Sequence, residues 1–256
     1  MENVLQVQNL AKSFGGVKAV DNISFDLEKR QLLAMIGPNG AGKSTCFNLI
    51  NGQLQPDSGS IVIMGRKMNG LKPRQVWKLG VGRTFQITAT FSSMTVLENV
   101  QVALLSHHKQ TQSILKKVQK LYVDEAMDLL KVVGIADQHD RACGVLAYGD
   151  LKRVELAVAL ASMPRLLLMD EPTAGMGPAE RSQLMSLTKD IVQTREIGVL
   201  FTEHDMDVVF THADRIIVLN RGQLVAEGTP EQVRANAEVQ KTYLGIKEAR
   251  RLEQIH

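Results

Sequence analysis

The segment GPNGAGKST at residues 37–45 constrains the fold of this chain more than any other feature. It matches the pattern G-x-x-x-x-G-K-[ST] and directly follows the apolar run LLAMI, so we expect a buried strand, a tight loop and then a helix. The glycines of such a loop let the backbone wrap around a phosphate group, with N–H groups and the helix N-terminus facing the anion. A chance glycine-rich turn is the alternative, and we reject it because the complete pattern stands at a strand–helix junction.

The residues of this segment, called the phosphate loop below, have separate expected tasks. Lys43 supplies positive charge to the phosphates, and Ser44 supplies a hydroxyl for magnesium. The predicted nucleotide-binding residues of the loop are Gly37, Pro38, Asn39, Gly40, Ala41, Gly42, Lys43, Ser44 and Thr45.

A second motif, LLLMDEP at residues 166–172, places two acidic residues directly after an apolar run. A buried parallel strand would end there, at the ligand-facing edge of its sheet. Asp170 would then support the magnesium, and Glu171 would polarise a water molecule for attack on the γ-phosphate. Taken alone, an apolar run ending in Asp-Glu is equally compatible with a helix-capping turn. The presence of the phosphate loop favours the functional interpretation.

The order of apolar patterns along the chain indicates an α/β fold. Short β-like runs stand at residues 4–7, 23–27, 32–36 and 61–64, and apolar residues recur at helical spacing over 96–133. After Tyr148 we expect a helix that begins near Leu151 and ends at Ser162. A buried run at 165–170, a helix from Pro178 to about Gln193, a strand at 198–201, a hairpin at 215–228 and short charged helices over 230–256 follow. Strands that alternate with helices imply a mostly parallel sheet.

Composition and charge exclude several classes of protein. With 44% hydrophobic and 22% charged residues, the chain has the composition of an ordinary globular protein. A net charge of +3 and an aromatic content of 4% argue against a dedicated nucleic-acid binder. The apolar runs are too short to cross a bilayer, and the two cysteines and the absence of a signal-peptide pattern predict a cytoplasmic location.

The motifs and their order resemble the ATP-binding subunits of ABC transporters over nearly the whole chain. In that family an aromatic residue ahead of the phosphate loop stacks on adenine, and Phe14 in KSFGGVKAV stands in the matching place; a core Phe at a strand end is the alternative. Gln86 in RTFQ matches the glutamine that touches magnesium and senses the membrane subunit. His204 in FTEHDMD matches the switch histidine that contacts the γ-phosphate, although a lone His after a strand is more often structural.

The resemblance therefore implies a set of site residues and two cofactors, ATP and Mg²⁺. The implied catalytic residues are Glu171, His204, Lys43 and Gln86, and the implied magnesium ligands are Ser44, Gln86 and Asp170. Without the resemblance, Gln86 would be interpreted as a surface residue.

The signature of the family, usually LSGGQ, corresponds here to Leu146, Ala147, Tyr148, Gly149 and Asp150. In the family, the serine hydroxyl and the glycine amides of this loop close over the γ-phosphate held by the opposing subunit. Ala147 removes that hydroxyl, so ATP-driven closure should be weakened. Gly177 likewise stands where most of the family has an Asp, which puts cross-subunit coupling through that carboxylate in doubt.

Several details resemble one subfamily, the ATPase subunits of branched-chain amino acid importers. They are the tyrosine in the signature, the AGM variant at 174–176, RTFQ, and the segment TYLG at 242–245. The subunit of lipopolysaccharide export shares the C-terminal pattern but is less similar around Gln86 and Tyr148, and it is the nearest alternative. A regulatory partner that binds ATP but hydrolyses it poorly is another alternative, against which Glu171 and His204 argue.

The expected architecture is a P-loop NTPase, with a RecA-like core and an antiparallel β subdomain over 1–87 and 161–256 and a helical subdomain at about 88–160. A chromosome-structure or repair ATPase is excluded, because no long coiled-coil insertion separates the nucleotide motifs. The resemblance implies a homodimer, or a heterodimer with a related ATPase, two integral membrane permease subunits and an extracytoplasmic substrate-binding protein, with no nucleic acid. It places the chain peripherally at the cytoplasmic face of the inner membrane.

Overall fold

The structure is a computed structural model, and it describes residues 2–84, 90–108 and 121–241. The strands are β1 (Asn3–Phe14), β2 (Val17–Glu28), β3 (Leu32–Ile36), β4 (Ser58–Ile63), β5 (Arg66–Lys67), β6 (Val81–Thr84), β7 (Leu166–Asp170), β8 (Gly198–Thr202), β9 (Arg215–Asn220) and β10 (Gln223–Gly228). The α-helices are α1 (Lys43–Ile50), α2 (Pro73–Trp77), α3 (Val96–His107), α4 (Val123–Val132), α5 (Tyr148–Leu160), α6 (Pro178–Arg195), α7 (Met206–His212), α8 (Pro230–Ala235) and α9 (Ala237–Val239). Two short 3-10 helices, η3 (Ala136–Gln138) and η4 (Cys143–Val145), precede α5.

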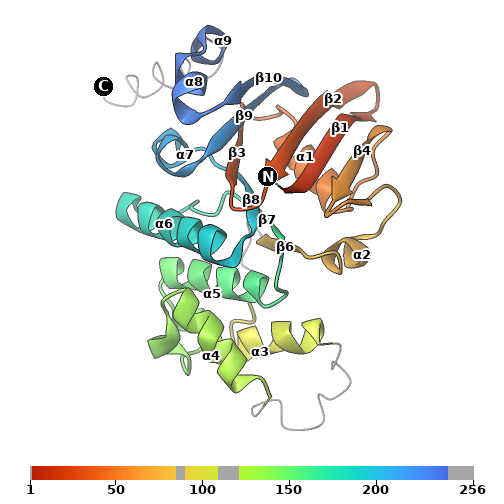
Figure 1. Cartoon of the computed structure of the whole chain (residues 1–256). Coiled ribbons are helices and arrows are strands. Elements are labelled where there is room, and N and C mark those ends of the chain that lie inside the picture. The colour runs from red at the N-terminus through yellow and green to blue at the C-terminus, as the bar shows by residue number, and fades with distance from the viewer. Residues whose placement is uncertain (1, 85–89, 109–120, 242–256) are drawn as a thin grey trace.

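The strands form two sheets (Figure 1). The four-stranded sheet has the order β2-β1-β4-β5, and its pairs are antiparallel. A tight turn at Gly15 and Gly16, which both have positive φ, reverses the chain between β1 and β2 and pairs Phe14 with Val17. This sheet corresponds to the antiparallel β subdomain expected beside the RecA-like core.

The six-stranded sheet, in the order β10-β9-β3-β8-β7-β6, carries the nucleotide motifs. Its strands β9, β3, β8, β7 and β6 run parallel, and only β10 is antiparallel to its neighbour. Every residue of β3 is buried: Leu32, Ala34 and Ile36 join one hydrophobic core and Leu33 and Met35 the other. A continuous apolar run such as LLAMI is therefore explained by burial on both faces of a parallel sheet. The predicted P-loop NTPase fold is confirmed.

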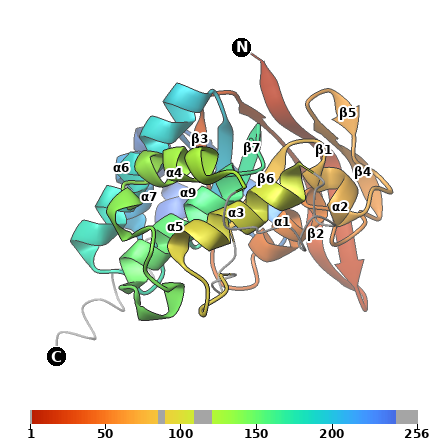
Figure 2. The same ribbon diagram turned by 90° about the horizontal axis from the view of Figure 1, so that it is seen from below.

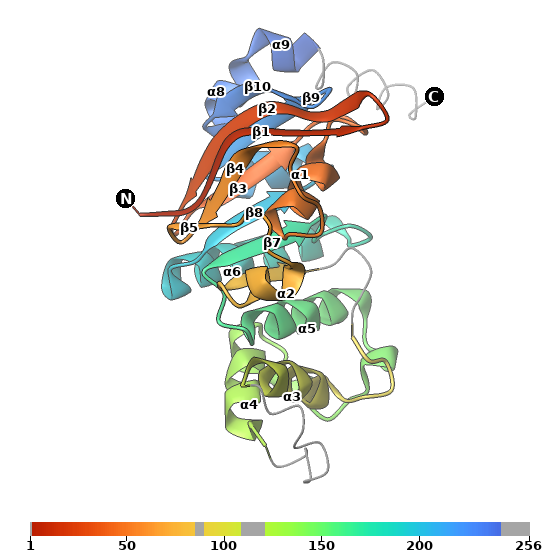
Figure 3. The ribbon, with the colours of Figure 1, turned by 90° about the vertical axis from the view of Figure 1, so that its right-hand side faces the viewer.

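The helices α3, α4 and α5 pack together at one end of the molecule, and α8 and α9 lie at the other (Figures 1 and 3). Seen from below, α3 and α4 lie in front of the sheets (Figure 2). The α5 helix contacts both α6 and β6, so it joins this helical layer to the six-stranded sheet. Among the described residues, no helix has the length and apolar character needed to cross a bilayer.

Most predicted elements have the expected type, but the start of the signature helix was predicted wrongly. We expected a helix beginning near Leu151, whereas α5 begins at Tyr148 with Ala147 as its N-cap. A helix can begin without a side-chain cap when its buried face packs against neighbouring elements, as residues of α5 do here. The helix α6 extends to Arg195, past the expected Gln193. The tail prediction beyond residue 241 lies outside the described residues.

Candidate active site

The phosphate loop is built around glycines that no other residue could replace. Gly37 and Gly42 have φ values of 151° and 104°. A Cβ atom on Gly37 would lie 2.2 Å from the carbonyl oxygen of Leu219, and one on Gly42 would lie 2.3 Å from that of Ala19. The backbone therefore packs directly against β9 and β2, and the loop has its shape because these two positions have no side chain.

The side chain of Lys43 lies within the curve of the loop. Its Nζ donates to the carbonyl oxygens of Gly37 at 2.7 Å and Pro38 at 3.1 Å, and the residue is buried. The helix α1 begins at Lys43 with Gly42 as a cap that offers no side-chain hydrogen bond, and its first turn has no acidic residue. A positive helix end with a buried ammonium group beside it fits the phosphates of a nucleotide.

The acidic motif and the strand beside it form a cross-strand hydrogen-bond network. Asp170 at the end of β7 pairs in register with Thr202 at the end of β8. The Thr202 hydroxyl donates to Asp170 Oδ1 at 2.7 Å, and the Glu171 N–H donates to Thr202 O at 3.2 Å and to Thr202 Oγ1 at 3.1 Å. Both carboxylates thus emerge at the carboxyl edge of the sheet, where parallel sheets bind their ligands.

Glu171 and His204 are brought together at this edge. His204 Nε2 and Glu171 Oε1 lie 2.7 Å apart although the residues are 33 positions apart in the chain. The side chains of His204 and Glu171 are 45% and 21% exposed, so both are accessible to a ligand above the sheet. The structure therefore places the predicted water-polarising carboxylate and the predicted switch histidine in direct contact.

The second oxygen of Asp170 faces Arg83, a residue that sequence reasoning missed. Arg83 Nη2 lies 3.5 Å from Asp170 Oδ2, and its Nη1 donates to Asn48 Oδ1 at 3.2 Å and Gln53 Oε1 at 3.1 Å. Arg83 stands within the RTFQ motif, so its position in that motif was the available signal. Gln86, the predicted magnesium contact in the same motif, lies outside the described residues.

The donor set beside the phosphate loop fits a magnesium ion accompanied by phosphates. Ser44 lies in the first turn of α1 next to Lys43, and Asp170 is the last residue of β7; the hydroxyl and the carboxylate both offer oxygen, the ligand atom that Mg²⁺ prefers. No group of three or more His, Cys, Asp or Glu side chains that could hold a metal occurs within the described part of the chain. This arrangement agrees with a magnesium ion held by a few protein oxygens together with phosphate oxygens.

Phe14 lies at the end of β1 and is 47% exposed, with Lys12 Nζ 5.6 Å from its ring centroid. The alternative interpretation, a core residue at a strand end, is therefore wrong. Its exposed ring can receive a planar group, so stacking on adenine stays the prediction for this residue.

The signature residues lie at the start of α5. Ala147 is the N-cap and provides no side-chain hydrogen bond to the first turn, while Tyr148 is 42% exposed. A Cβ on Gly175 would lie 3.2 Å from Tyr148 Cε1, so the tyrosine ring packs against the segment that follows Glu171. Asp150 Oδ2 accepts a hydrogen bond from Gln138 Nε2 at 2.9 Å.

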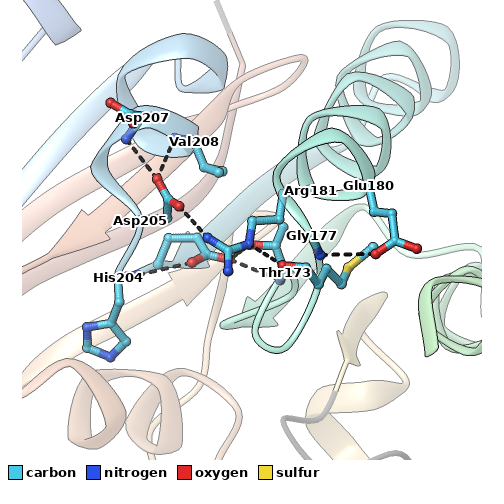
Figure 4. Close-up of polar contacts among 10 residues, drawn as sticks. Thr173, Gly177, Glu180, Arg181, His204, Asp205, Asp207 and Val208 are labelled. Carbon is cyan, nitrogen blue, oxygen red and sulfur yellow. Dashed lines mark hydrogen bonds and ion pairs between the residues drawn. The ribbon is translucent and has the colours of Figure 1, made fainter.

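The segment 173–177, after Glu171, is linked to the segment that carries His204, as Figure 4 shows. The links run through Thr173, Arg181, Glu203 and Asp205, none of which the sequence analysis identified. Gly177 is the N-cap of α6, and its N–H donates to Glu180 Oε2 at 3.0 Å. Glycine is acceptable at an N-cap, so the absence of the usual Asp does not prevent α6 from starting there.

Comparison with known proteins identifies the family. The family model described as ABC transporter matches residues 20–174, and the model described as Branched-chain amino acid ATP-binding cassette transporter matches residues 223–249. The high-affinity branched-chain amino acid transport ATP-binding protein LivG of Escherichia coli (strain K12) is 38% identical over 250 residues, which cover 94% of this chain and 98% of that protein.

Solved structures agree with these matches. An ATP-binding cassette of an ABC transporter in its ADP conformation superposes with a TM-score of 0.85 and 30% identity, over 96% of this chain and 100% of the other. A dimeric ATP-binding cassette in a post-hydrolysis state, bound to ADP and Pi, superposes with a TM-score of 0.73 and 25% identity, over 88% and 98%. The chain therefore belongs to the ABC transporter family as an ATP-binding cassette, and it is an ATPase.

Proposed function

We propose that this chain energises the import of branched-chain amino acids by hydrolysing ATP. The observation that carries the proposal is the match of residues 223–249 to the branched-chain amino acid cassette, together with the similarity to LivG over 94% of the chain. The contact between Glu171 and His204 supports hydrolysis over a role limited to nucleotide binding.

The site residues suggest how hydrolysis proceeds. Lys43 and the first turn of α1 bind the phosphates, and magnesium, when held by Ser44, Asp170 and Gln86, supplies charge neutralisation. Glu171 orients and polarises the attacking water, because its backbone N–H is held at the sheet edge by hydrogen bonds to Thr202 O and Oγ1 and its carboxylate contacts His204. His204 holds the Glu171 carboxylate and, with ATP bound, contacts the γ-phosphate.

A second ATPase chain, identical or related, completes each site. The signature residues 146–150 lie at the N-terminal end of α5 in the helical layer, whereas the phosphate loop connects β3 of the six-stranded sheet to α1 (Figure 3). One chain therefore offers its signature to the nucleotide of another, and the dimeric ADP-bound relative supports this arrangement. In the resulting pair, two ATP molecules lie between the chains.

We expect the membrane subunits to dock at an apolar groove between α2, β6, α3 and α5. The groove has a volume of about 320 Å³ and is lined by residues that include Val76, Trp77, Arg83, Ala103 and Val158. It adjoins the RTFQ motif, so its occupant would sense changes near the nucleotide. We expect a cytoplasmic helix of a permease subunit to occupy it, with the chain lying peripherally at the cytoplasmic face of the inner membrane together with two permeases and an extracytoplasmic binding protein.

Reconstitution of the complex tests this function. The chain is co-purified with its membrane and binding-protein subunits and placed in vesicles, and ATP-dependent uptake of labelled leucine, isoleucine and valine is measured. Glu171→Gln should keep ATP affinity but abolish most turnover and uptake, because it removes the polarising carboxylate and preserves the shape of the site.

Two outcomes would contradict the proposal in different ways. Active ATP hydrolysis without uptake of any branched-chain amino acid would overturn the substrate. Unchanged hydrolysis by Glu171→Gln would overturn the role of the carboxylate. Binding of labelled amino acids to the isolated binding-protein subunit provides an independent measure of the substrate.

A further inference from the structure

His204 lies between two acidic residues whose side chains both reach the segment 173–181. Glu203 precedes it and accepts hydrogen bonds from Thr173, and Asp205 follows it and accepts one from Arg181. Figure 4 shows the imidazole ring of His204 pointing away from Arg181 and Thr173. The backbone on both sides of the ring is thus held, while the ring itself contacts Glu171 Oε1.

Glu203 makes the first of these two connections. Its side chain is buried, with the residue only 3% exposed. Oε1 accepts from the Thr173 N–H at 2.9 Å and from the Thr173 hydroxyl at 2.5 Å, and Oε2 accepts from the His204 N–H at 3.0 Å. Both carboxylate oxygens are therefore used, one for the segment after Glu171 and one for the backbone of His204.

Arg181 makes the second connection. Its Nε donates to the carbonyl oxygen of Met176 at 2.6 Å, and its Nη1 forms an ion pair with Asp205 Oδ2. The other oxygen of Asp205 caps α7 by accepting from the N–H groups of Asp207 at 3.0 Å and Val208 at 3.3 Å. The start of α7 is in this way attached to the segment that follows Glu171.

We propose that Glu203 is a positioning residue for hydrolysis, which fixes the backbone of His204 relative to the segment after Glu171, with Arg181 and Asp205 supporting it from the other side. The inference rests on the proposed role of His204. A buried carboxylate that accepts three hydrogen bonds from two segments holds both segments in one arrangement. A shift of a catalytic group by about 1 Å can lower turnover by about 10²-fold. Because Glu203 is almost completely buried, it acts through the backbone of His204 and through Thr173.

The test is a double-mutant cycle in the whole chain, with steady-state ATP hydrolysis as the readout. Glu203→Gln keeps the size of the side chain, but its NH₂ group must face either Thr173 or the His204 N–H, so one connection is lost. We expect kcat to fall about tenfold or more, with KM for ATP within about twofold, because the phosphate-binding residues are untouched. In a His204→Ala background, the same change should lower kcat by less than about twofold.

A matched control comes from α6, the helix that carries Arg181. Gln193 lies on α6, is exposed and donates from its Nε2 to the carbonyl oxygen of Arg30 at 3.0 Å, so it contacts neither the segment 173–177 nor the segment that carries His204. Gln193→Met should leave kcat within about twofold of wild type, whereas Arg181→Met should lower it in the same direction as Glu203→Gln. Thr173→Val, which removes only the hydroxyl donor, tests the same connection if Glu203→Gln does not fold, and it should lower kcat several-fold with the same dependence on His204.

The outcomes separate this inference from the role of His204. An unchanged kcat in folded Glu203→Gln, or an equal loss in both backgrounds, would overturn positioning through His204 while His204→Ala alone remains impaired. A normal kcat in His204→Ala would overturn the proposed role of the histidine and, with it, this inference. Loss of kcat in Glu203→Gln that disappears in the His204→Ala background supports it.

Discussion

Glu171 adopts a backbone conformation that non-glycine residues rarely use, with φ of 49°. Such a conformation costs about 1–2 kcal/mol relative to the right-handed region. Two hydrogen bonds from its N–H to Thr202 and the contact of its carboxylate with His204 offset this cost. Because the backbone turns sharply directly after β7, the Glu171 side chain is directed along the sheet edge to His204, which follows the neighbouring strand β8. At the scale of single residues, the chemistry of the site therefore depends on backbone geometry as well as on residue type.

Phe14→Ala should weaken ATP binding by about 0.5–1.5 kcal/mol, which is about 2- to 12-fold in Kd, because one aromatic stacking pair is lost. The melting temperature should change little, since the ring is half-exposed and outside both cores. Titration calorimetry and thermal melting of the ligand-free chain measure the two effects. The neighbouring Val17, 69% exposed and paired with Phe14 across the hairpin, gives the control Val17→Ala. A collapsed melting temperature with unchanged affinity would assign Phe14 to the fold.

Among the elements, α7 shows how a short helix is fixed at both ends. Asp205 caps its first turn, Val208 and Val209 bury its apolar face, and His212 closes its last turn in a buried position 3.5 Å from Ser182 Oγ. The helix starts two residues after His204, so its attachment also limits the movement of the histidine. Burial, and to a lesser extent the nearby Lys189, lower the pKa of His212 from its ordinary value of 6.5.

The lowered pKa of His212 predicts that the chain loses stability as the pH falls below about 6.5. Between the folded and the unfolded pKa, the unfolded chain binds more protons, so the free energy of unfolding decreases with falling pH. Replacing this side chain, as in His212→Gln, should reduce that part of the decrease. Urea unfolding at several pH values between 5.5 and 7.5 measures the free energy of unfolding, and His108→Gln, at an exposed position, is the control. Equal pH slopes for wild type and His212→Gln would contradict the assignment.

At the scale of the whole molecule, two cores hold the parts of the nucleotide site in place. One core joins the six-stranded sheet to α3, α4, α5 and α6, and the other joins it to α1 and the antiparallel sheet. The signature at the start of α5 and the phosphate loop before α1 therefore belong to different cores. We propose that this separation lets two chains complete each other's sites, with the strength of the closure set by the groups that the signature offers to the partner's nucleotide.

Ala147→Ser should raise ATP-dependent dimerisation, most visibly in the Glu171→Gln background. One added hydrogen bond to a charged phosphate contributes roughly 1.5–3 kcal/mol per site before ordering costs. Because Ala147 is the N-cap of α5, serine there should also stabilise the monomer by about 1 kcal/mol. Light scattering in ATP and in ADP separates the effects, since the capping gain needs no nucleotide. Identical dimer fractions in ATP would show that residue 147 does not face the partner's phosphate.

Local patterns in the sequence are sufficient to predict those parts of this protein that depend on neighbouring residues. The phosphate loop needs glycine at Gly37 and Gly42, because a side chain there would collide with backbone, and the LLAMI run needs burial on both faces. The phosphate loop with its preceding strand, and likewise the Asp-Glu pair after the run LLLM, are short contiguous motifs, so the P-loop fold and the Asp-Glu strand end could be predicted from neighbouring residues alone. The resemblance added Phe14 and His204, which no spacing would have identified.

Contacts between residues far apart in the chain depend on how the strands and helices pack. The order β3-β8-β7 places His204 beside Glu171, and Glu203 became recognisable only when its buried carboxylate was seen between Thr173 and the His204 N–H. The start of α5 at Tyr148, without a side-chain cap, likewise depends on packing against α6 and the sheet. Strand order and buried polar contacts arise from the packing of segments far apart in the chain, and a single sequence contains no local signal for them.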